Sequence, residues 1–558
     1  IKIIKSGRFL VFLLFITFGS YCQTPNTIIP LKGEWYYQLD TAGIGIDNEW
    51  QKNTFAAKLK LPGTLDENGV GYIRNYKCRC LINFMNFGPH IQCNPFKDSS
   101  SFHLSRKTAY TGAAWFKKEI DIPVSMQGMY LELHIERSKV SRVWIDDQFI
   151  GTSKLLSARQ VYNLTEKLTP GKHVLTIMVD NEPDLVPTGL SHIYSYDTQT
   201  NWSGMLGDLH IAVYQPVHIE KVAVYTDIHM REVVAKIKIK NPGLKEKKID
   251  IELQATSWNT ARQQLLPSKI YHVPLNSTDT EIKLVYPMGP TPHLWSEYSP
   301  AMYKLNLTTS AGKKKLDQRV VNFGMREFKA RGTNFEINNA VTFLRGKNDG
   351  CVFPLTGYPP MDTTEWCRYF RIAKSYGINH IRFHSWCPPA AAFEAANVLG
   401  VYLQVELPYW GSYEEGNKTL IDFMKNEAMH ILDAYGNNPS FVMMTLGNEL
   451  SGNRKIMDGM VSDLKNYDNR HLYAFGTNAL FTEPHPGAYD DFWPIVWTRS
   501  KKDSTTFQPV RAAFSTNEDA GNGLINTLYP STKTNYSESV KNYKLPIIGH
   551  EVGQFQVY

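Results

Sequence analysis

The sequence predicts a multidomain protein in which two β-sandwiches precede a parallel α/β barrel, and three observations support this prediction. The chain has 558 residues, and at about 150 residues per domain this length predicts three or four domains. Residues 29–323 hold short runs in which apolar and polar positions alternate, which is typical of strands buried on one face. From residue 325 onward, short apolar strands alternate with segments of helical period, which favours a parallel sheet covered by helices.

The first 22 residues have the pattern of a signal peptide. Three basic residues precede an apolar run over residues 9–18 that is too short to span a bilayer. We therefore expect an exported protein, periplasmic or extracellular, from which residues 1–22 are removed. Lipid anchoring at Cys22 is the competing interpretation, and the bulky Tyr21 before it argues against anchoring. No later run reaches membrane-spanning length, so we expect no transmembrane segment after the leader.

Residues 29–216 are predicted to form the first β-sandwich. Residues 129–136 place an apolar side chain at every second position, and the strand-like residues 140–145 follow closely. Residues 146–147 form an Asp-Asp turn signal, and residues 172–180 make another strand-like run. Strands at this spacing indicate two facing antiparallel sheets.

Residues 217–323 are predicted to form a second, smaller sandwich. Residues 217–225, 233–239 and 303–307 alternate clearly between apolar and polar positions. A β-unit of this size fits an immunoglobulin-like fold.

Residues 325–558 are predicted to form a (β/α)8 barrel that stops before its last strand. Strands are expected at 380–384, 401–405, 441–446, 471–475 and 546–550, with helices at 363–376, 390–399, 419–435 and 453–467. An open doubly wound sheet fits the same alternation. No Gly-rich phosphate loop follows any of these strands, which argues against a nucleotide-binding sheet and favours the barrel. The eighth strand is expected beyond Tyr558.

The ends of these strands carry the candidate catalytic residues. In parallel barrels the active site lies at the carboxyl ends of the strands. Two glutamates, Glu449 and Glu551, end separate apolar strands among aromatic, Asn, Arg and His side chains. One carboxylic acid could protonate a glycosidic oxygen while the other carboxylate attacks the anomeric carbon. Taken alone, each glutamate would more often be a structural carboxylate paired with a neighbouring arginine.

The composition argues against several other classes of function. The net charge of +7 is spread thinly over the chain, so we expect no nucleic-acid partner. A zinc site at Cys78, Cys80, Cys93 and His90 is disfavoured because the first spacing is too tight, and free thiols or one disulfide are expected instead. No metal or organic cofactor is expected, and the sequence does not indicate an oligomeric state.

The order of the three parts and several motifs resemble glycoside hydrolase family 2, which includes β-galactosidases, β-glucuronidases and β-mannosidases. The motifs are residues 113–123, 143–151, 202–207, 294–303, 323–327, 335–348 and 447–449. The resemblance implies a jelly-roll-like, sugar-binding first domain. It also implies that Glu449 is the general acid/base, that Asn448 binds the sugar 2-hydroxyl, and that Glu551 is a nucleophile forming a covalent glycosyl-enzyme with retention of configuration.

The resemblance also implies residues that bind the substrate. Arg382 and His384 match residues near the substrate at the end of the second barrel strand. Trp410 is interpreted either as a platform on which a sugar stacks or as part of the core. Asn348 and Asp349 stand where the family often places sugar contacts.

Two features depart from the family pattern. The usual Asn-x-His pattern is absent because Asn348 is followed by Asp349 and Gly350. Residues 75–100, with three cysteines, interrupt the first domain where a shorter connection is expected.

The sequence therefore predicts a hydrolase of O-glycosyl compounds that removes terminal sugars from oligosaccharides or polysaccharides by double displacement. A β-galactosidase-like specificity is expected first, with a β-glucuronidase-like or another family 2 specificity as the alternative. A non-catalytic carbohydrate-binding protein is the alternative of another class.

Overall fold

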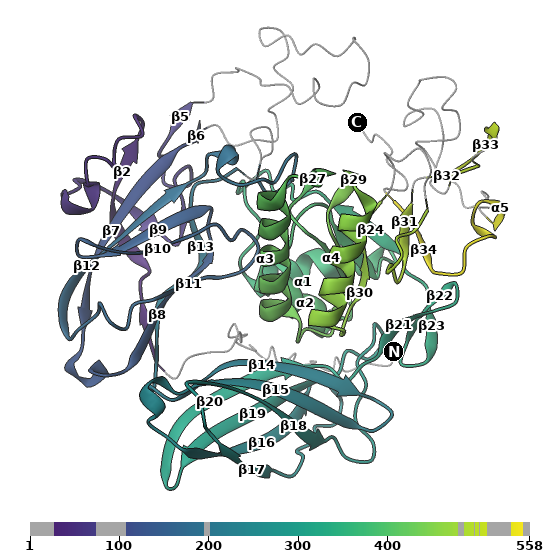
Figure 1. Cartoon of the computed structure of the whole chain (residues 1–558), viewed down its shortest axis with the longest axis horizontal. Helices are drawn as coiled ribbons and strands as arrows, with labels where there is room; N and C mark the ends of the chain where they lie inside the picture. The colour runs from purple at the N-terminus through teal and green to yellow at the C-terminus, as the bar shows by residue number, and fades with distance from the viewer. Residues whose placement is uncertain are drawn as a thin grey trace, which may run out of the picture.

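The computed structural model describes residues 27–73, 108–194, 201–477, 485–495, 497–500, 503–509 and 537–550. A β-rich body lies at the left of Figure 1, a second one lies below it, and a body of helices and short strands lies beside both. The predicted leader, the residues 75–100 and the strand-end residues Asn478 and Glu551 lie outside the described residues. In the described part of the chain, no helix combines the length and the apolar character needed to cross a membrane.

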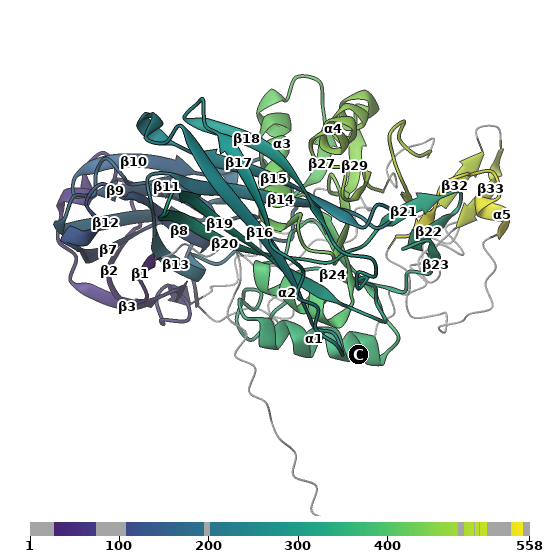
Figure 2. The same cartoon turned by 90° about the horizontal axis from the view of Figure 1, so that it is seen from below.

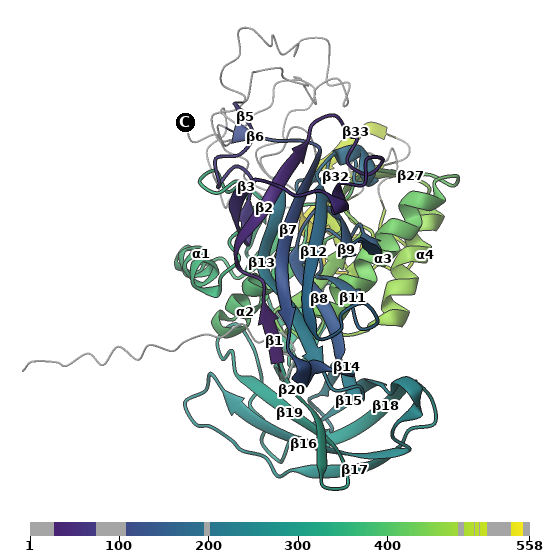
Figure 3. The same cartoon turned by 90° about the vertical axis from the view of Figure 1, so that its left-hand side faces the viewer.

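The first body consists of two antiparallel sheets facing each other (Figure 3). One sheet has the order β1-β13-β8-β11 with β4 beside β13, and the other has the order β10-β9-β12-β7-β2-β3. The alternating runs bury Leu133, Ile135 and Ile177 in the core between the sheets, with the aromatic rings of Trp35 and Phe116. The strands are β1 Thr27–Pro30, β2 Gly33–Asp40, β3 Ala57–Leu61, β4 Gly63–Thr64, β7 Ala113–Ile122, β8 Tyr130–Arg137, β9 Val140–Ile145, β10 Gln148–Ser153, β11 Gln160–Asn163, β12 Gly171–Asp180 and β13 Gly204–Tyr214, with the short pair β5 Tyr72–Ile73 and β6 Thr108–Ala109 beside them.

The second body is a smaller antiparallel sandwich. A three-stranded sheet of order β14-β15-β18 faces a four-stranded sheet of order β17-β16-β19-β20. In β15 every second side chain is buried, as the alternation of its sequence requires. The strands are β14 His218–Asp227, β15 Glu232–Lys240, β16 Lys248–Trp258, β17 Lys269–Pro274, β18 Asp279–Pro287, β19 Met302–Ala311 and β20 Lys314–Phe323.

The third body is built on a five-stranded sheet of order β24-β25-β26-β28-β30, in which every neighbouring pair is parallel. Its strands are β24 Gly346–Asp349, β25 His380–Phe383, β26 Tyr402–Glu406, β28 Phe441–Thr445 and β30 Leu472–Ala474, and its helices are α1 Thr363–Ser375, α2 Ala390–Leu399, α3 Lys418–Tyr435 and α4 Arg454–Tyr467. The helix pairs α1–α2 and α3–α4 lie apart in Figure 2. A parallel pair of β31 Trp493–Ile495 and β34 Ile547–Gly549 is separate from this sheet, and the described residues do not form a closed barrel.

Short elements complete the third body. The meander β21 Phe328–Arg331, β22 Asn334–Ile337 and β23 Ala340–Thr342 precedes the parallel sheet. The strands β27 Trp410–Tyr413 and β29 Asn448–Gly452 pair in parallel beyond the ends of β26 and β28. Near the end of the described chain lie the hairpin β32 Trp497–Ser500 and β33 Asp503–Pro509 and the helix α5 Ser537–Val540.

The two faces of the parallel sheet differ in chemistry. Ile381, Leu403 and Val405 belong to the large apolar cluster that also contains the buried side chains of the helices. Because strand side chains alternate between faces, the residues between them, Arg382 and Gln404, point to the opposite face. That second face carries buried charged and polar groups close to the carboxyl ends of the strands.

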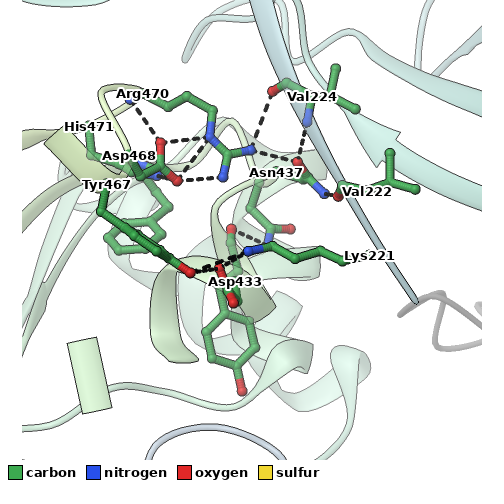
Figure 4. A network of polar contacts seen from close by, with 12 residues as sticks. Lys221, Val222, Val224, Asp433, Asn437, Tyr467, Asp468, Arg470 and His471 are labelled. Carbon is green, nitrogen blue, oxygen red and sulfur yellow. Dashed lines mark hydrogen bonds and ion pairs between the residues drawn. The ribbon is translucent and has the colours of Figure 1, made fainter. Parts of the chain in front are cut away.

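The second body is fixed to the helical body by a polar network (Figure 4). The Asn437 side chain donates to the carbonyl of Val222 at 2.8 Å and accepts from the amide of Val224 at 2.8 Å. Lys221 binds Asp433 on α3, and the Tyr467 hydroxyl donates to the same carboxylate at 2.7 Å. β14 is an edge strand of its sheet, so Asn437 acts as a side-chain substitute for a neighbouring strand.

Buried charges join the first body to the helical body. Glu427 on α3 is fully buried and accepts hydrogen bonds from the amides of Leu156 and Ser157 at 2.7 and 3.1 Å. The Arg137 guanidinium at the end of β8 donates to the Tyr435 hydroxyl at 3.3 Å. Burial raises the pKa of Glu427, and the two amide bonds oppose that rise. If the first body separated from the helical body, Glu427 would lose its bonds to the amides of Leu156 and Ser157, and Arg137 would lose its bond to Tyr435.

The Asn437→Ala substitution tests the network between the second and third bodies. We expect it to lower the free energy of unfolding by about 1–3 kcal/mol, because it leaves the Val222 carbonyl and the Val224 amide without their partner. Urea denaturation followed by circular dichroism measures the change. The control is Asn276→Ala at an exposed turn, for which we expect a change within about 0.5 kcal/mol. Equal effects of the two variants would contradict the role of Asn437.

Candidate active site

A buried ion pair lies at the carboxyl end of the parallel sheet. Arg382 in β25 and Glu406 at the end of β26 expose 8% and 2% of their surface, so both charges are removed from water. The guanidinium donates from Nε to Oε1 at 2.7 Å and from Nη2 to Oε2 at 3.0 Å, which is a bidentate pair. The Glu406 carboxylate also accepts from the Ser385 amide at 2.8 Å and from the Thr445 hydroxyl at 3.2 Å.

The remaining donors of Arg382 reach two asparagines. Nη1 donates to Asn348 Oδ1 at 2.8 Å, and Nη2 donates to Asn448 Oδ1 at 2.7 Å. One guanidinium therefore connects β24, β25, β26 and the start of β29. Asn448 is fully buried, and its Nδ2 has no hydrogen-bond partner among the described residues. Since its oxygen faces Arg382, the amide nitrogen is the end of the side chain that remains to donate.

Burial and the positive charge of Arg382 lower the pKa of His380, which lies on the same face of β25. His380 lies two residues before Arg382 in β25 and is buried. Burial, reinforced by the positive charge of Arg382, lowers the pKa of His380 to about 3. His380 therefore stays neutral at neutral pH, and Arg382 is the cation that neutralises Glu406.

Glu449 follows Asn448 in a strained backbone conformation. Its φ of 38° lies in the left-handed region, which a non-glycine residue adopts only when its surroundings impose it. Its side chain is 16% exposed, and Oε1 lies 3.7 Å from Nε2 of His550, at the end of β34. The end of β34 therefore meets the end of β28 at this carboxylate.

Asp349, predicted to contact the sugar, binds protein groups. Its carboxylate accepts from the Cys351 amide at 3.0 Å and from the Tyr369 hydroxyl, and it lies 3.3 Å from the Lys347 ammonium group. Burial and the neighbouring Asp349 charge raise the pKa of Tyr369. Asp349 thus fixes the chain after β24.

Three rings, those of His384, Trp410 and His192, pack together beside Asn448, and we call them the aromatic wall. The rings of His384 and Trp410 meet edge to face, with centroids 5.3 Å apart. Trp410 begins β27 and pairs with Asn448 in the register of β27 and β29. The His192 ring from the first body completes this wall, with its centroid 4.3 Å from that of His384.

His192 reaches the wall because a segment of the first body docks onto the third. Gly189 forms a parallel bridge with Trp410, and the Leu190 amide donates to the Trp410 carbonyl at 3.2 Å. The Ser191 hydroxyl donates to the Ser385 carbonyl at 3.0 Å, and the His192 amide donates to the Ser385 hydroxyl at 2.9 Å. A side chain at Gly189 would place Cβ 2.3 Å from the Trp410 carbonyl oxygen, so this approach requires glycine.

The structure brings most of the predicted site residues together. Arg382 contacts Asn348 and Asn448, and the His384 ring contacts Trp410. Glu551 lies outside the described residues. Glu406 and His192 were not among the site residues predicted from the sequence.

The described residues hold no group of three or more His, Cys, Asp or Glu side chains that could bind a metal ion. Cys351, Cys367 and Cys387 are free, buried thiols. The predicted alternatives for Cys78, Cys80 and Cys93 fall outside the described residues.

Comparison with known proteins gives one family match and several distant relatives. The sequence model named "Glycosyl hydrolases family 2" matches residues 217–326. A putative β-glucuronidase of Formosa agariphila is 23% identical over 401 residues, covering 69% of this chain and 46% of that protein. These matches and the likeness to a solved family 2 structure support glycoside hydrolase family 2 for this chain.

Other family 2 proteins carry different names. The β-galactosidase of Staphylococcus xylosus is 22% identical, over 82% of this chain and 43% of that protein. The chain thus spans less than half the length of these two curated relatives.

Solved family 2 structures share the fold. The β-glucuronidase of Parabacteroides merdae with glycerol in its active site has a TM-score of 0.64 at 17% identity, covering 86% of this chain and 60% of that one. A putative β-galactosidase from Bacteroides fragilis has a TM-score of 0.64 at 16% identity, covering 84% and 66%. These likenesses show the multidomain fold.

Glu406→Gln tests how far this site depends on the buried ion pair. We expect the free energy of unfolding to fall by about 3 kcal/mol, because removing one partner leaves the Arg382 charge buried without a counter-charge. The control is Glu365→Gln, which removes a carboxylate from an exposed pair with Arg368, and its effect should stay within about 1 kcal/mol. Chemical denaturation measures both, and a Glu406→Gln effect as small as that of the control would contradict the ion pair's role.

Proposed function

We propose that the complete protein is a retaining exo-glycosidase whose acid/base is Glu449 and whose nucleophile is Glu551. The observation that supports this most directly is the 3.7 Å contact between Glu449 Oε1 and His550 Nε2. It brings Glu449 to the end of β34, and Glu551 is the next residue in the sequence. Retaining glycosidases need two carboxyl groups about 5–5.5 Å apart.

The strand arrangement supports a barrel as the scaffold of this site. The five strands of the parallel sheet follow one another in chain order, and the parallel pair β31–β34 comes after them. Together they match the first seven strands of a (β/α)8 barrel. We propose that an eighth strand completes the barrel in the full protein. The pairs Arg382–Glu406 and Glu449–His550 lie at the carboxyl ends of these strands, where barrel active sites are found.

In the proposed reaction, Glu551 attacks the anomeric carbon while the Glu449 carboxylic acid protonates the departing oxygen. Water then hydrolyses the glycosyl-enzyme with Glu449 acting as base, so the anomeric configuration is retained. Asn448 would donate from Nδ2 to the sugar 2-hydroxyl, and Arg382 holds the amide in that orientation through Oδ1. Hydrogen bonds to this hydroxyl strengthen in the transition state of glycoside hydrolysis.

We further propose that the terminal sugar is neutral, as in a β-galactoside. A β-glucuronide would need a cation for its carboxylate, and the two cations that bind Asn348, Arg382 and Lys347, already bind acidic groups. Arg382 binds Glu406 through two hydrogen bonds, and Lys347 lies 3.3 Å from Asp349. A β-glucuronidase is the second candidate because a putative β-glucuronidase is 23% identical to this chain and a solved β-glucuronidase shares the fold with a TM-score of 0.64.

The setting of the reaction is proposed from the leader alone. A basic segment followed by the apolar residues 9–18 supports export to the periplasm or the cell exterior. A polymeric glycan outside the cell would then be accessible to the enzyme.

Replacing the two glutamates tests the mechanism. With the complete protein and an aryl β-glycoside, we expect Glu551→Ala to abolish turnover and azide to restore it with inverted configuration, because azide then attacks in place of the missing carboxylate. Glu449→Gln should lower kcat by about 10²–10⁴-fold, the usual contribution of general acid/base catalysis. Product configuration is read by NMR, and Glu414→Gln is the control, since Glu414 is an exposed residue after β27. Turnover that survives Glu551→Ala would refute the nucleophile, and binding without turnover by the wild type would favour the non-catalytic alternative.

A substrate comparison tests the neutral-sugar proposal. We expect kcat/KM for an aryl β-galactoside to exceed that for the matching β-glucuronide by about tenfold or more, since an uncompensated carboxylate in a buried site costs at least about 1.4 kcal/mol. Initial rates with the two substrates, which share one leaving group, measure the ratio. A ratio below one would establish the β-glucuronidase alternative.

A further inference from the structure

We propose that His192, supplied by the first body, is a positioning residue of the active site that takes the space left by Gly350. Its imidazole holds Trp410 and His384 against Asn448. This inference rests on the proposed function and names a residue that the barrel itself does not provide.

His192 is held by one hydrogen bond of its ring and one of its backbone amide. Its Nδ1 lies 2.8 Å from the Gly350 carbonyl oxygen, which can only accept, so Nδ1 carries the proton and donates. Its backbone amide donates to the Ser385 hydroxyl at 2.9 Å. Both partners belong to the third body and directly follow β24 and β25. These bonds fix the position of the ring relative to the ends of β24 and β25, which carry the site residues.

Gly350 is small where His192 needs room. A Cβ at position 350 would lie 3.3 Å from both Cε1 and Nδ1 of His192, which is tighter than ordinary van der Waals contact. The φ of Gly350 lies outside the left-handed region, so its backbone does not require glycine. A side chain at position 350 would therefore be in steric conflict with the imidazole of His192.

The His192 ring packs on the two rings that border Asn448. It meets His384 at an interplanar angle of 69° and lies parallel to Trp410, with an angle of 6° and centroids 6.2 Å apart. Trp410 is paired with Asn448, the residue before Glu449. Loss of the imidazole would leave both neighbouring rings without a support on one side. A displacement of about 1 Å in a positioning group can lower the rate by about 10²-fold.

The first experiment measures turnover of an aryl β-galactoside by the complete protein. His192→Ala should lower kcat by about 10–100-fold with a smaller change in KM, because positioning acts on the transition state. His192→Phe retains the ring contacts and should recover part of that loss. His173→Ala is the matched control, since His173 in β12 of the same body also makes two hydrogen bonds and lies outside the site. Wild-type kcat in His192→Ala would overturn the proposal.

The second experiment exchanges the two residues. Gly350→His and His192→Gly should each lower kcat, and the double variant should recover a large part of either loss because it restores one imidazole to the shared space. If the two substitutions combine additively, the residues do not share that space and the proposal is wrong.

The third experiment uses thermal unfolding, which does not depend on activity. Gly350→Ala should lower the Tm of the wild type by about 2 °C or more and should have no such effect in the His192→Gly background. Equal effects in both backgrounds would overturn the inference. Absence of wild-type turnover on every aryl glycoside would contradict the proposed function instead, and the thermal cycle would still decide whether His192 fills the space beside Gly350.

Discussion

The arrangement of the candidate site depends on the bidentate pair between Arg382 and Glu406. Taking two charges out of water is unfavourable, and the pair is stable only because further hydrogen bonds satisfy both groups. Arg382 supplies two more donors to asparagines, while Glu406 accepts from Ser385 and Thr445. These bonds tie together β24, β25, β26, β28 and the start of β29. The ion pair therefore fixes the side chains at the end of the parallel sheet, including Asn348 and Asn448, which backbone hydrogen bonds alone would not position.

Glycines let neighbouring segments approach this support closely. At Gly447, with a φ of 141°, a Cβ would lie 2.3 Å from the Tyr409 carbonyl oxygen, so only glycine allows β29 to start here. At Gly189 the same distance to the Trp410 carbonyl oxygen allows the first body to dock. The segment around Trp410 is thus enclosed from both sides. The strained φ of Glu449 persists because these contacts over-determine the backbone beside it.

The sequence predicts the residues whose signal is local. Apolar runs mark the strands, and the polar residues after them include Arg382, Asn448 and Glu449, which the structure brings to one edge. Glu406 also directly follows an apolar run, at 401–405, but only the structure shows that it neutralises Arg382. His192 has no such local signal, because it is separated from Ser385 by nearly two hundred residues and comes from another domain. A glycine directly after β24 leaves room for a side chain from elsewhere, but the sequence does not say which residue takes that room.

A site built from two domains links the stability of the first body to the geometry of the site. The segment that carries His192 is held by hydrogen bonds to Ser385, Trp410 and Gly350, and each bond crosses the junction between the bodies. The same junction contains Glu427, whose buried carboxylate needs the amides of Leu156 and Ser157. Separating the bodies would leave that carboxylate without these partners and would remove His192 from the wall at the same time. The charged groups that stabilise the junction are therefore also what hold the imidazole beside Trp410, although none of them lies within the site.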